Sequence, residues 1–349
     1  MESAAGQPET AVSVRLMTPD APIARVGRIF FFKRGLPVEY LVQLCQMGFV
    51  LLFAPLLRGI MERYRARLAG RHGPQIWQPY RDLRKWWGKD TLRTNQASWV
   101  SEWTAVAYFA APLVVAMLIP VLTAFPLPFA WMGDMLAGGM ILGAAGFALL
   151  LAALDSGSVY PALGVSRLRL IGAFTEPLAV MLVFTAAAAA RATIPFVVNQ
   201  ALVSSRWLWS PTHVLLTVAW FLFLIAETGR IPVDNPSSTQ ELSMIDPSRT
   251  FESSGRDLAL YEWGGWMKLL VLLIILMNVL TTPWGLAPRI GLVAVGTAVL
   301  AVALKVTLAA LLLVTVEMSF AKLRLIRNVD FLVAAMVVAA LGSIGAMLL

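Results

Sequence analysis

The chain has 349 residues, of which 58% are hydrophobic and 14% are charged, and its formal net charge is +8. So apolar a composition excludes a soluble domain and is typical of a protein that crosses a membrane several times. With one cysteine, two distant histidines and neither a Walker nor a dinucleotide-binding glycine motif, the chain itself is expected to bind no metal, haem, iron–sulfur cluster or nucleotide.

Residues 1–38 are polar to mixed and lack the long apolar core of a signal peptide, so we interpret them as a flexible N-terminal extension. Eight apolar segments follow, each long enough to cross a hydrocarbon core of about 30 Å at roughly 1.5 Å per residue. They lie at about 39–60, 104–125, 133–154, 170–190, 211–228, 263–281, 288–316 and 328–348. The segment 191–209 is either an interfacial helix or a helix extension. The sequence therefore predicts an all-α membrane protein with eight transmembrane helices in one domain, 39–349.

Positive charge predicts the orientation. Ten of the 28 lysine and arginine residues lie between positions 58 and 93, at the end of the first span and in the loop after it. The loops after the third, fifth and seventh spans are also basic, whereas the alternate loops hold only Arg191, Arg206 and Arg289. By the positive-inside rule the odd-numbered loops face the cytoplasm, and we expect a multi-pass protein of the cell inner (cytoplasmic) membrane. This charge is expected to meet the lipid bilayer rather than nucleic acid.

The first of these loops contains GRHGPQIWQPYRDLRKWWGKD, in which aromatic and basic residues alternate. Residues 75–89 are predicted to form an amphipathic helix that lies in the membrane interface.

Asp155 ends the third span, where it either caps a loop or joins the ion-coupling residues. Two nearby glycines, Gly139 and Gly143, form a GxxxG motif typical of packing between neighbouring helices.

Glu176 lies inside the fourth span and is followed by Pro177. Because proline lacks an N–H, the carbonyl of Ala173 is expected to lose its helical partner. A carboxylate beside a locally opened backbone suits a group that binds or relays a proton. The alternative is an ion pair with an arginine of a neighbouring helix.

The longest concentration of ionisable residues is AETGRIPVDNPSSTQELSMIDPSRTFESSGRDLALYE, residues 226–262. Glu227 ends the fifth span, and the loop continues with Arg230, Asp234, Glu241 and Glu252. Carboxylates gathered at low dielectric have raised pKa values and titrate as coupled sets, as a proton-loading site near neutral pH requires. We therefore predict a role in ion coupling. The alternatives are charges that merely solvate the loop and, for Glu241, an exposed face that docks a partner.

Two lysines lie in the last spans of the chain. Lys305 is in the middle of the seventh span, where a lone lysine is costly, and we interpret it as a cation in a charge relay. Lys268 is close enough to the end of the sixth span to snorkel toward the membrane surface.

Three of these segments carry a family resemblance. The first loop resembles the GP…QP..D..K…K loop of the eight-helix membrane subunit that respiratory complex I (where it is subunit 1) shares with the group 4 [NiFe] hydrogenases. The connection between the third and fourth helices of that family resembles the segment DSGSVYPALGVSRLRLIGAFTEP of this chain. The acidic loop of the family resembles the segment AETGRIPVDNPSSTQEL…FESSG. The match covers about 39–349. It implies a partner-docking loop with Arg71, Gly73, Pro74, Gln78, Pro79, Asp82, Lys85 and Lys89.

Departures from the complex I pattern point to one branch of this superfamily. IPVDNP stands where complex I has APFDLPE, which resembles the hydrogenase-4 and formate hydrogenlyase type. That branch implies a subunit with no catalytic residue of its own. Its expected partners are a small subunit with an iron–sulfur cluster, a large subunit with a nickel–iron centre, and antiporter-like membrane subunits. The rivals are the quinone-chamber membrane subunit of an NADH-quinone oxidoreductase, a purely structural anchor, and an independent transporter.

Overall fold

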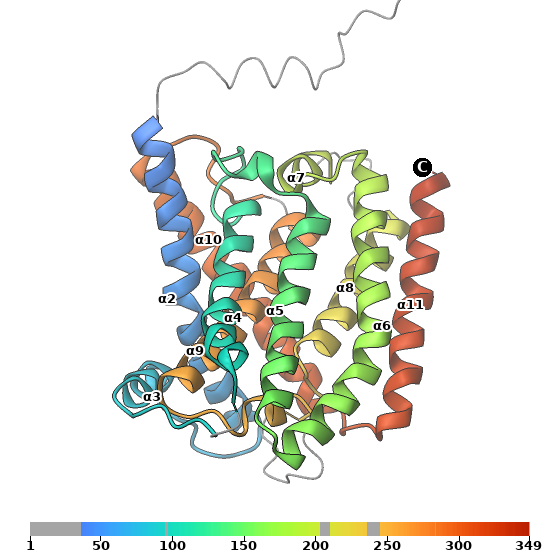
Figure 1. Cartoon of the computed structure of the whole chain (residues 1–349). Coiled ribbons are helices and arrows are strands. Elements are labelled where there is room, and N and C mark those ends of the chain that lie inside the picture. The colour runs from blue at the N-terminus through green and yellow to red at the C-terminus, as the bar shows by residue number, and fades with distance from the viewer. Residues whose placement is uncertain (1–35, 95–96, 203–209, 236–244, 283, 349) are drawn as a thin grey trace, which may run out of the picture. The chain divides into compact units, whose positions relative to one another are not determined.

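The computed structural model describes residues 36–94, 97–202, 210–235, 245–282 and 284–348. The predicted extension, 1–38, lies outside these ranges except for its last three residues. Glu241 also lies outside them. Within them the protein is all-helical (Figure 1). The helices are α2 (Leu36–Leu68), α3 (Gln78–Trp87), α4 (Trp99–Leu118), α5 (Met135–Asp155), α6 (Val159–Ala190), α7 (Pro195–Leu202), α8 (Pro211–Glu227), α9 (Gly255–Ile274), its π-helical continuation η4 (Ile275–Thr281), α10 (Leu292–Ser319) and α11 (Leu325–Leu348), with short 3-10 turns η1 (Ala130–Met132) and η3 (Pro247–Thr250).

Seven of the eight predicted spans correspond to helices that are long and apolar enough to cross a membrane. The fifth, α8, has 17 residues and is shorter. It still runs antiparallel to α6. The short helix α7, which leads into α8, packs on α6 and follows directly after the end of that helix. Beyond the other end of α8, Ser248 of η3 lies against Gly164, near the start of α6. The ambiguous segment 191–209 contains α7, and its residues 203–209 are outside the described ranges.

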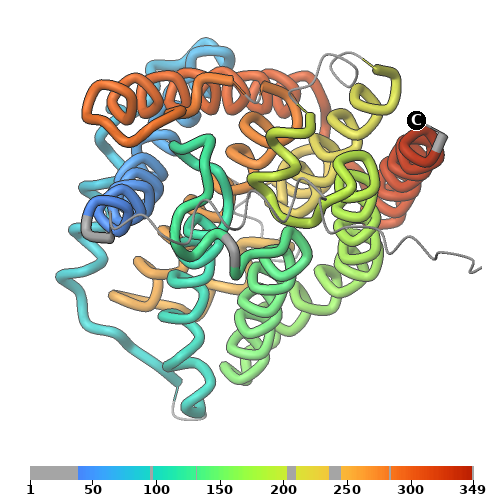
Figure 2. The backbone as a smooth tube through the Cα atoms, turned by 90° about the horizontal axis from the view of Figure 1, so that it is seen from above, coloured from blue at the N-terminus to red at the C-terminus, as the bar shows by residue number. Residues whose placement is uncertain are grey.

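The helix α9 with η4 forms the centre of the bundle. In an apolar 18-residue stretch of this span 78% of the residues are buried, against 28–39% in the corresponding stretches of the other long spans. The helix packs on α4, which packs in turn on α5, while α11 packs on α6 and α8. Figure 2 shows α10 strongly tilted along one edge, and α11 almost end-on beside α6. Lys268, in the middle of α9, is therefore placed in the interior, whereas Arg256 in its first turn is exposed.

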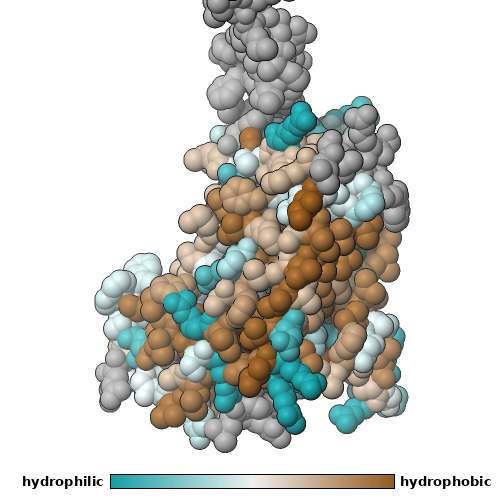
Figure 3. Space-filling view, turned by 90° about the vertical axis from the view of Figure 1, so that its right-hand side faces the viewer, coloured by the Kyte–Doolittle hydropathy of each residue, from teal (hydrophilic) through white to brown (hydrophobic). Residues whose placement is uncertain are grey.

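The outer helices are apolar on both faces. On α11, Leu332, Ala335 and Ala339 are buried, while Val337 and Leu341 on the opposite face are exposed. Hydrophobic side chains dominate the face shown in Figure 3, and hydrophilic ones gather mainly toward its lower end. A helix that is hydrophobic all round is typical of a membrane span, so this surface faces lipid or other membrane subunits.

The four positively charged loops meet at one end of the bundle. The backbone N–H of Leu92, in the first loop, donates to Ser254 Oγ at the end of the loop after α8. Asp155, at the end of α5, accepts from the backbone N–H of Ser98. The N–H of Leu323, in the loop after α10, donates to the carbonyl of Pro232 in the loop after α8. We call this the charged end of the bundle.

Candidate functional site

The C-terminus of α8 fixes the first residue of the site. The Ser210 side chain caps the start of α8, and Pro211 is its first residue. At the other end Gly229 has a φ of 56°, and the N–H groups of Gly229 and Arg230 bond back to the carbonyls of Ala226 and Ile225. This left-handed glycine cap ends the helix at Glu227 and turns Arg230 inward.

Glu227 forms an ion pair with Lys268 of α9. The Lys268 Nζ lies 2.6 Å from Glu227 Oε1, and the Lys268 side chain is only 9% exposed. The expectation that Lys268 snorkels to the surface is wrong, because its ammonium instead faces the carboxylate at the end of α8. A buried charge needs such a partner, since desolvation without one is very unfavourable.

Arg230 belongs to a second buried cluster. Its Nη1 lies 2.7 Å from Glu317 Oε1, in the last turns of α10, and the other Glu317 oxygen pairs with Arg65 of α2. The Glu317 side chain is 1% exposed. Burial lowers the pKa of the Arg230 guanidinium, and the negative charge of Glu317 opposes this effect. Glu317 therefore joins α2, α10 and the loop after α8.

Asp234 is the third anchor of this loop. Its side chain is 1% exposed and lies 2.7 Å from Lys322 Nζ. The other carboxylate oxygen accepts from the backbone N–H of Asp246 at 2.8 Å. Asp246 pairs with Arg249 and lies against Gly229, whose missing side chain makes room for it. Burial alone would lower the pKa of Arg249, but Asp246 and the other nearby negative charges raise it. The buried charges thus fold the loop back onto itself.

Two cavities border this arrangement. The first, here the polar cavity, has a volume of 140 Å³ and lies between α2, α4, α9 and the loop after α8. Its ionisable lining residues are Arg58, Tyr108, Glu227, Arg230, Asp246, Arg249, Tyr261, Glu262 and Lys268. The second, here the membrane cavity, has a volume of 580 Å³ and lies between α4, α5, α6, α8 and α9. Its lining is mostly apolar, with Asp134, Arg169, Glu176, Glu227 and Lys268 as the ionisable members.

Glu176 lines the membrane cavity from α6. The helix continues through Pro177, and the Glu176 side chain is exposed at the surface of this chain. It forms no ion pair with any residue that the structure describes, so the predicted alternative of an arginine partner is not met there. Gly139 and Gly143 on α5 line the same cavity, and a side-chain atom added at either would meet nothing within 4 Å. The GxxxG motif therefore faces open space and packs against no helix of the described chain.

The other predicted ion-coupling residues lie away from these pairs. Asp155 accepts hydrogen bonds from the Ser98 N–H at 2.7 Å and the Ser101 hydroxyl at 2.6 Å, and so holds the start of α4. Lys305 of α10 donates to the carbonyls of Thr282 and Trp284, where α9 and η4 end. Neither residue contacts Glu227.

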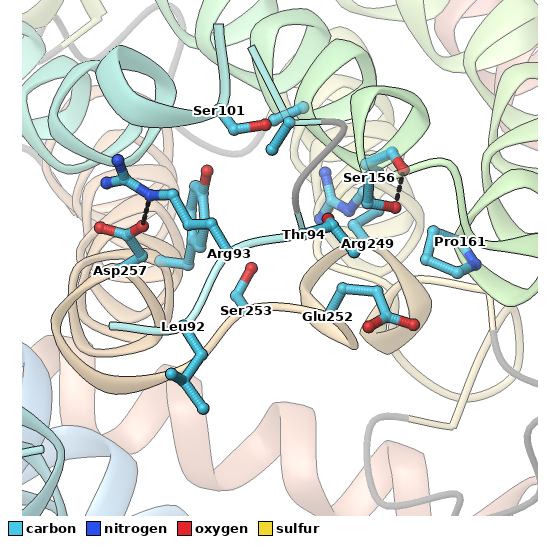
Figure 4. Close-up of a pocket in the computed structure, with 14 residues that line it drawn as sticks. Leu92, Arg93, Thr94, Ser101, Ser156, Pro161, Arg249, Glu252, Ser253 and Asp257 are labelled. Atoms are coloured by element: carbon cyan, nitrogen blue, oxygen red, sulfur yellow. Dashed lines mark hydrogen bonds and ion pairs between the residues drawn. The ribbon is translucent and has the colours of Figure 1, made fainter. Parts of the chain in front are cut away.

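Glu252 is exposed at a small cavity where the first loop meets the loop after α8 (Figure 4). At this junction Arg93 pairs with Asp257 of α9 at 2.9 Å and with Glu102 of α4 at 3.4 Å. The hydrogen bond to Asp257 raises the pKa of the Arg93 guanidinium. The junction is part of the surface of the charged end.

The predicted docking loop forms a separate surface of the charged end. Its C-terminal part is α3, which supports the amphipathic helix predicted over 75–89, and within it Gln78 bonds to Asp82 at 2.9 Å. Gly73 lies against the backbone of Arg63, so that the loop packs closely on α2. Among the predicted docking residues, Pro79 is buried and Gly73, Gln78 and Asp82 are half-buried. The exposed ones are Arg71, Pro74, Lys85 and Lys89.

Sequence reasoning assigned no role in the site to Glu317, Lys268 or Arg249. Glu317 and Lys268 each carry a charge within an apolar helix, which is the same signal that selected Lys305. Arg249 lies in the short turn η3 of the charged loop, where charge alone does not distinguish it from its neighbours. The partners of these three residues lie 87, 41 and 3 residues away along the chain. For the two long-range pairs, only the tertiary fold shows which charge meets which.

Comparison with known proteins agrees with this architecture. Hydrogenase-4 component C of Escherichia coli (strain K12) is 30% identical over 291 residues, which span 83% of this chain and 90% of that protein. Formate hydrogenlyase subunit 4 of the same organism is 30% identical over 273 residues, 78% of this chain and 87% of that protein. A chain in the structure of the membrane-bound sulfane sulfur reductase, an archaeal respiratory membrane complex, has the same fold, with a TM-score of 0.75 at 19% identity over 88% of this chain and 99% of that one.

The predicted resemblance to the membrane subunit of complex I and the group 4 hydrogenases is confirmed by these matches. Residues 41–348 match the NADH dehydrogenase family, which is nearly the whole helical unit. The chain therefore belongs to the NADH dehydrogenase family.

Proposed function

We propose that this chain is the integral membrane subunit of a membrane-bound hydrogenase complex of the hydrogenase-4 or formate hydrogenlyase type. It anchors the peripheral electron-transfer module at its charged end and couples redox chemistry to the movement of protons or sodium ions. The iron–sulfur clusters and the nickel–iron centre belong to the partner subunits. The two relatives, each 30% identical and matched over 87–90% of their length, support the hydrogenase assignment.

The observation that carries the coupling role is the series of largely buried charges beneath the loop after α8. Glu227, Arg230 and Asp234 are each paired with a charge from a different helix or loop. Charges withdrawn from water respond strongly to a nearby change of charge, because the local dielectric is low. Reduction of a cluster in a subunit docked on this end would therefore shift the protonation of the two carboxylates, and a unit change in pKa corresponds to about 1.4 kcal/mol.

The exposed Glu176 supports a partner in the membrane. Glu176 forms no ion pair within the described ranges of the chain. A carboxylate left without a partner in a membrane span is costly, and such groups normally face a bundle interior or pair with another charge. We propose that an antiporter-like subunit covers the membrane cavity at α5 and α6. The open space at Gly139 and Gly143 allows a helix of that subunit to approach closely.

A quinone-chamber subunit of an NADH-quinone oxidoreductase is the second candidate. The observation that favours it is the family match itself, because the family is that of NADH dehydrogenase. Purified complex that reduces a water-soluble quinone with NADH as donor would establish this candidate in place of the hydrogenase.

Exchange of Glu227 for Gln tests the coupling role. We expect the complex to assemble and form hydrogen while ion movement across vesicle membranes falls sharply, because glutamine keeps the shape of the side chain but cannot take up a proton. Wild-type ion movement in this variant, and in Glu176→Gln, would instead leave the chain as a purely structural anchor.

A further inference from the structure

The Glu227–Lys268 ion pair lies where the two cavities meet. Among the residues that the structure describes, only Glu227 and Lys268 line both the polar cavity and the membrane cavity. The other buried pairs differ in this respect, since neither Glu317 nor Asp234 lines either cavity. The closed pair therefore separates a polar space at the charged end from an apolar space open toward the membrane.

Lys268 has an alternative set of partners on the polar side. Glu262, also on α9, lines the polar cavity and forms no ion pair within the described chain. Asp246, on the loop, lines the same cavity and is held by Arg249. The remaining charged groups facing this space are Arg58 of α2 and Arg230 of the loop. A lysine side chain has a flexible four-carbon stem, so its ammonium can turn within such a cavity while it stays charged.

Glu227 has an acceptor on the membrane side. Glu176 lines the membrane cavity together with Glu227, and Thr175 lies beside it on α6. Asp134, Arg169 and Lys268 are the other ionisable residues of this mostly apolar lining. A proton that leaves Glu227 toward the membrane therefore has a second carboxylate, Glu176, in the same cavity.

We propose that Lys268 opens and closes the junction between the two cavities, an inference that rests on the proposed function in its proton-moving form. Glu227 accepts a proton from water in the polar cavity and becomes neutral, which ends its attraction for the ammonium. Lys268, still protonated, turns toward Glu262. Glu227 then passes its proton to Glu176 in the membrane cavity, becomes an anion again and draws Lys268 back. Glu176 releases the proton to the antiporter-like subunit proposed to cover this cavity and becomes an anion again, so one proton enters and one leaves in each cycle, and Lys268 changes only its position.

Inverted membrane vesicles that contain the whole complex provide the test. Reduced methyl viologen supplies electrons, hydrogen formation reports the partner subunits, and a pH-sensitive dye reports the protons moved for each hydrogen formed. The variants are Lys268→Met, which removes the charge, Lys268→Arg, which keeps it, and Glu227→Gln. Met267→Leu is the control, because Met267 is fully buried one residue earlier on α9 and lines neither cavity.

In Lys268→Met we expect hydrogen formation to continue while the protons moved per hydrogen fall by about tenfold or more, because Glu227 then has no ammonium to draw back, and tenfold corresponds to only about 1.4 kcal/mol. Lys268→Arg should retain a substantial part of the wild-type ratio of protons moved to hydrogen formed. Met267→Leu should retain all of it. If Lys268→Met fails to assemble, Lys268→Gln takes its place, because its amide can still donate a hydrogen bond to Glu227 but carries no charge, and we expect the same loss of proton movement.

The outcomes separate the two proposals. A normal ratio in Lys268→Met, or in Lys268→Gln where it replaces that variant, together with a lost ratio in Glu227→Gln, overturns the role of Lys268 and leaves the proposed function standing. Sodium movement in place of proton movement in the wild type also overturns only the role of Lys268. Wild-type vesicles that form hydrogen without moving either ion overturn both.

Discussion

At the scale of single residues, the structure is organised by buried charges that meet across long sequence separations. Glu317 is shared by Arg65 and Arg230, from α2 and the loop after α8. Removal of one member of a buried ion pair leaves the others desolvated without compensation, which typically costs about 3–5 kcal/mol. Such residues affect folding and coupling together, so a control is needed to separate the two.

Exchange of Glu317 for Gln is expected to lower the free energy of unfolding by about 3–5 kcal/mol, because two arginines lose their common carboxylate. The midpoint of thermal unfolding of the detergent-solubilised complex measures the change. Glu62→Gln is the matched control. Glu62 pairs with Arg58 one turn away on α2 with its side chain 31% exposed, so about 0–1 kcal/mol is expected. Equal midpoints in the two variants would show that the buried cluster does not stabilise the fold.

Exchange of Lys322 for Met is expected to loosen the loop after α8. Among the residues that the structure describes, the buried Asp234 carboxylate then keeps the hydrogen bond from the Asp246 N–H, and the loss of a bond to a charged group costs about 1.5–3 kcal/mol. The rate of proteolytic cleavage between residues 228 and 254 should rise in open membranes. Arg324→Met, at an exposed position two residues along, should leave the rate unchanged. Faster cleavage in Arg324→Met than in Lys322→Met would contradict the anchoring of Asp234 by Lys322.

The sequence identified one side of each pair. Glu227, Arg230 and Asp234 stand out because they lie at or just after the end of an apolar helix, in the motif that resembles the family's acidic loop. Their partners Lys268, Glu317 and Lys322 lie on other elements, and no local pattern links them to the loop. Lys305 carried the same signal as Glu317, yet it meets only the carbonyls of Thr282 and Trp284. A lone charge in an apolar helix thus indicates a buried partner without indicating its kind.

At the scale of elements, the docking loop is fitted closely to α2. A side-chain atom added at Gly59 would lie 1.9 Å from the carbonyl oxygen of Ile76, just before α3. The loop can therefore lie against α2 only because position 59 has no side chain. The same helix has a second glycine, Gly48, where an added atom would meet nothing within 4 Å.

Exchange of Gly59 for Ala is expected to displace residues 69–77 and α3, at a cost of about 1–3 kcal/mol for overpacking. The peripheral subunits should then be recovered with this chain in lower yield after mild-detergent purification. Gly48→Ala on the same helix should preserve the yield and stabilise α2 by about 0.5–1 kcal/mol. An undiminished yield in Gly59→Ala would show that the position of α3 does not govern docking.

Hydropathy predicted the elements better than their ends. Each of the eight apolar segments contains a helix, but two of these helices extend well beyond the apolar core. The polar last turns of α2 continue to Leu68, and the polar first turns of α6 begin at Val159. A hydropathy pattern has no signal for such turns. It also has none for η4, where α9 continues as a π-helix held by Asn278, whose side chain donates to the carbonyls of Pro120 and Val121.

At the scale of the whole molecule, the basic loops gather at one end, as the positive-inside pattern predicts. Their mutual contacts place them on the same side of the bundle, and the charge rule assigns that side to the cytoplasm. Arg324 lies exposed in one of these loops, and Arg289 lies exposed in the connection between η4 and α10.

Cysteine labelling tests this orientation. In a Cys45→Ser background, which removes the only cysteine, Arg324→Cys should react with a membrane-impermeant maleimide only in inverted vesicles. Arg289→Cys should react in intact cells with the outer membrane opened. Both residues reacting from the same side would contradict the crossing of the bundle between them, and the opposite pattern would reverse the orientation.

The central claim is that this chain is the membrane subunit of a hydrogenase complex, and affinity purification from native membranes in mild detergent tests it most directly. Mass spectrometry of the recovered proteins should find a large subunit of the nickel–iron type, a small subunit with cluster-binding cysteines, and antiporter-like membrane subunits. Recovery of an NADH-oxidising module in their place would assign the chain to a quinone reductase. Recovery of the chain alone from intact, active membranes would contradict the account.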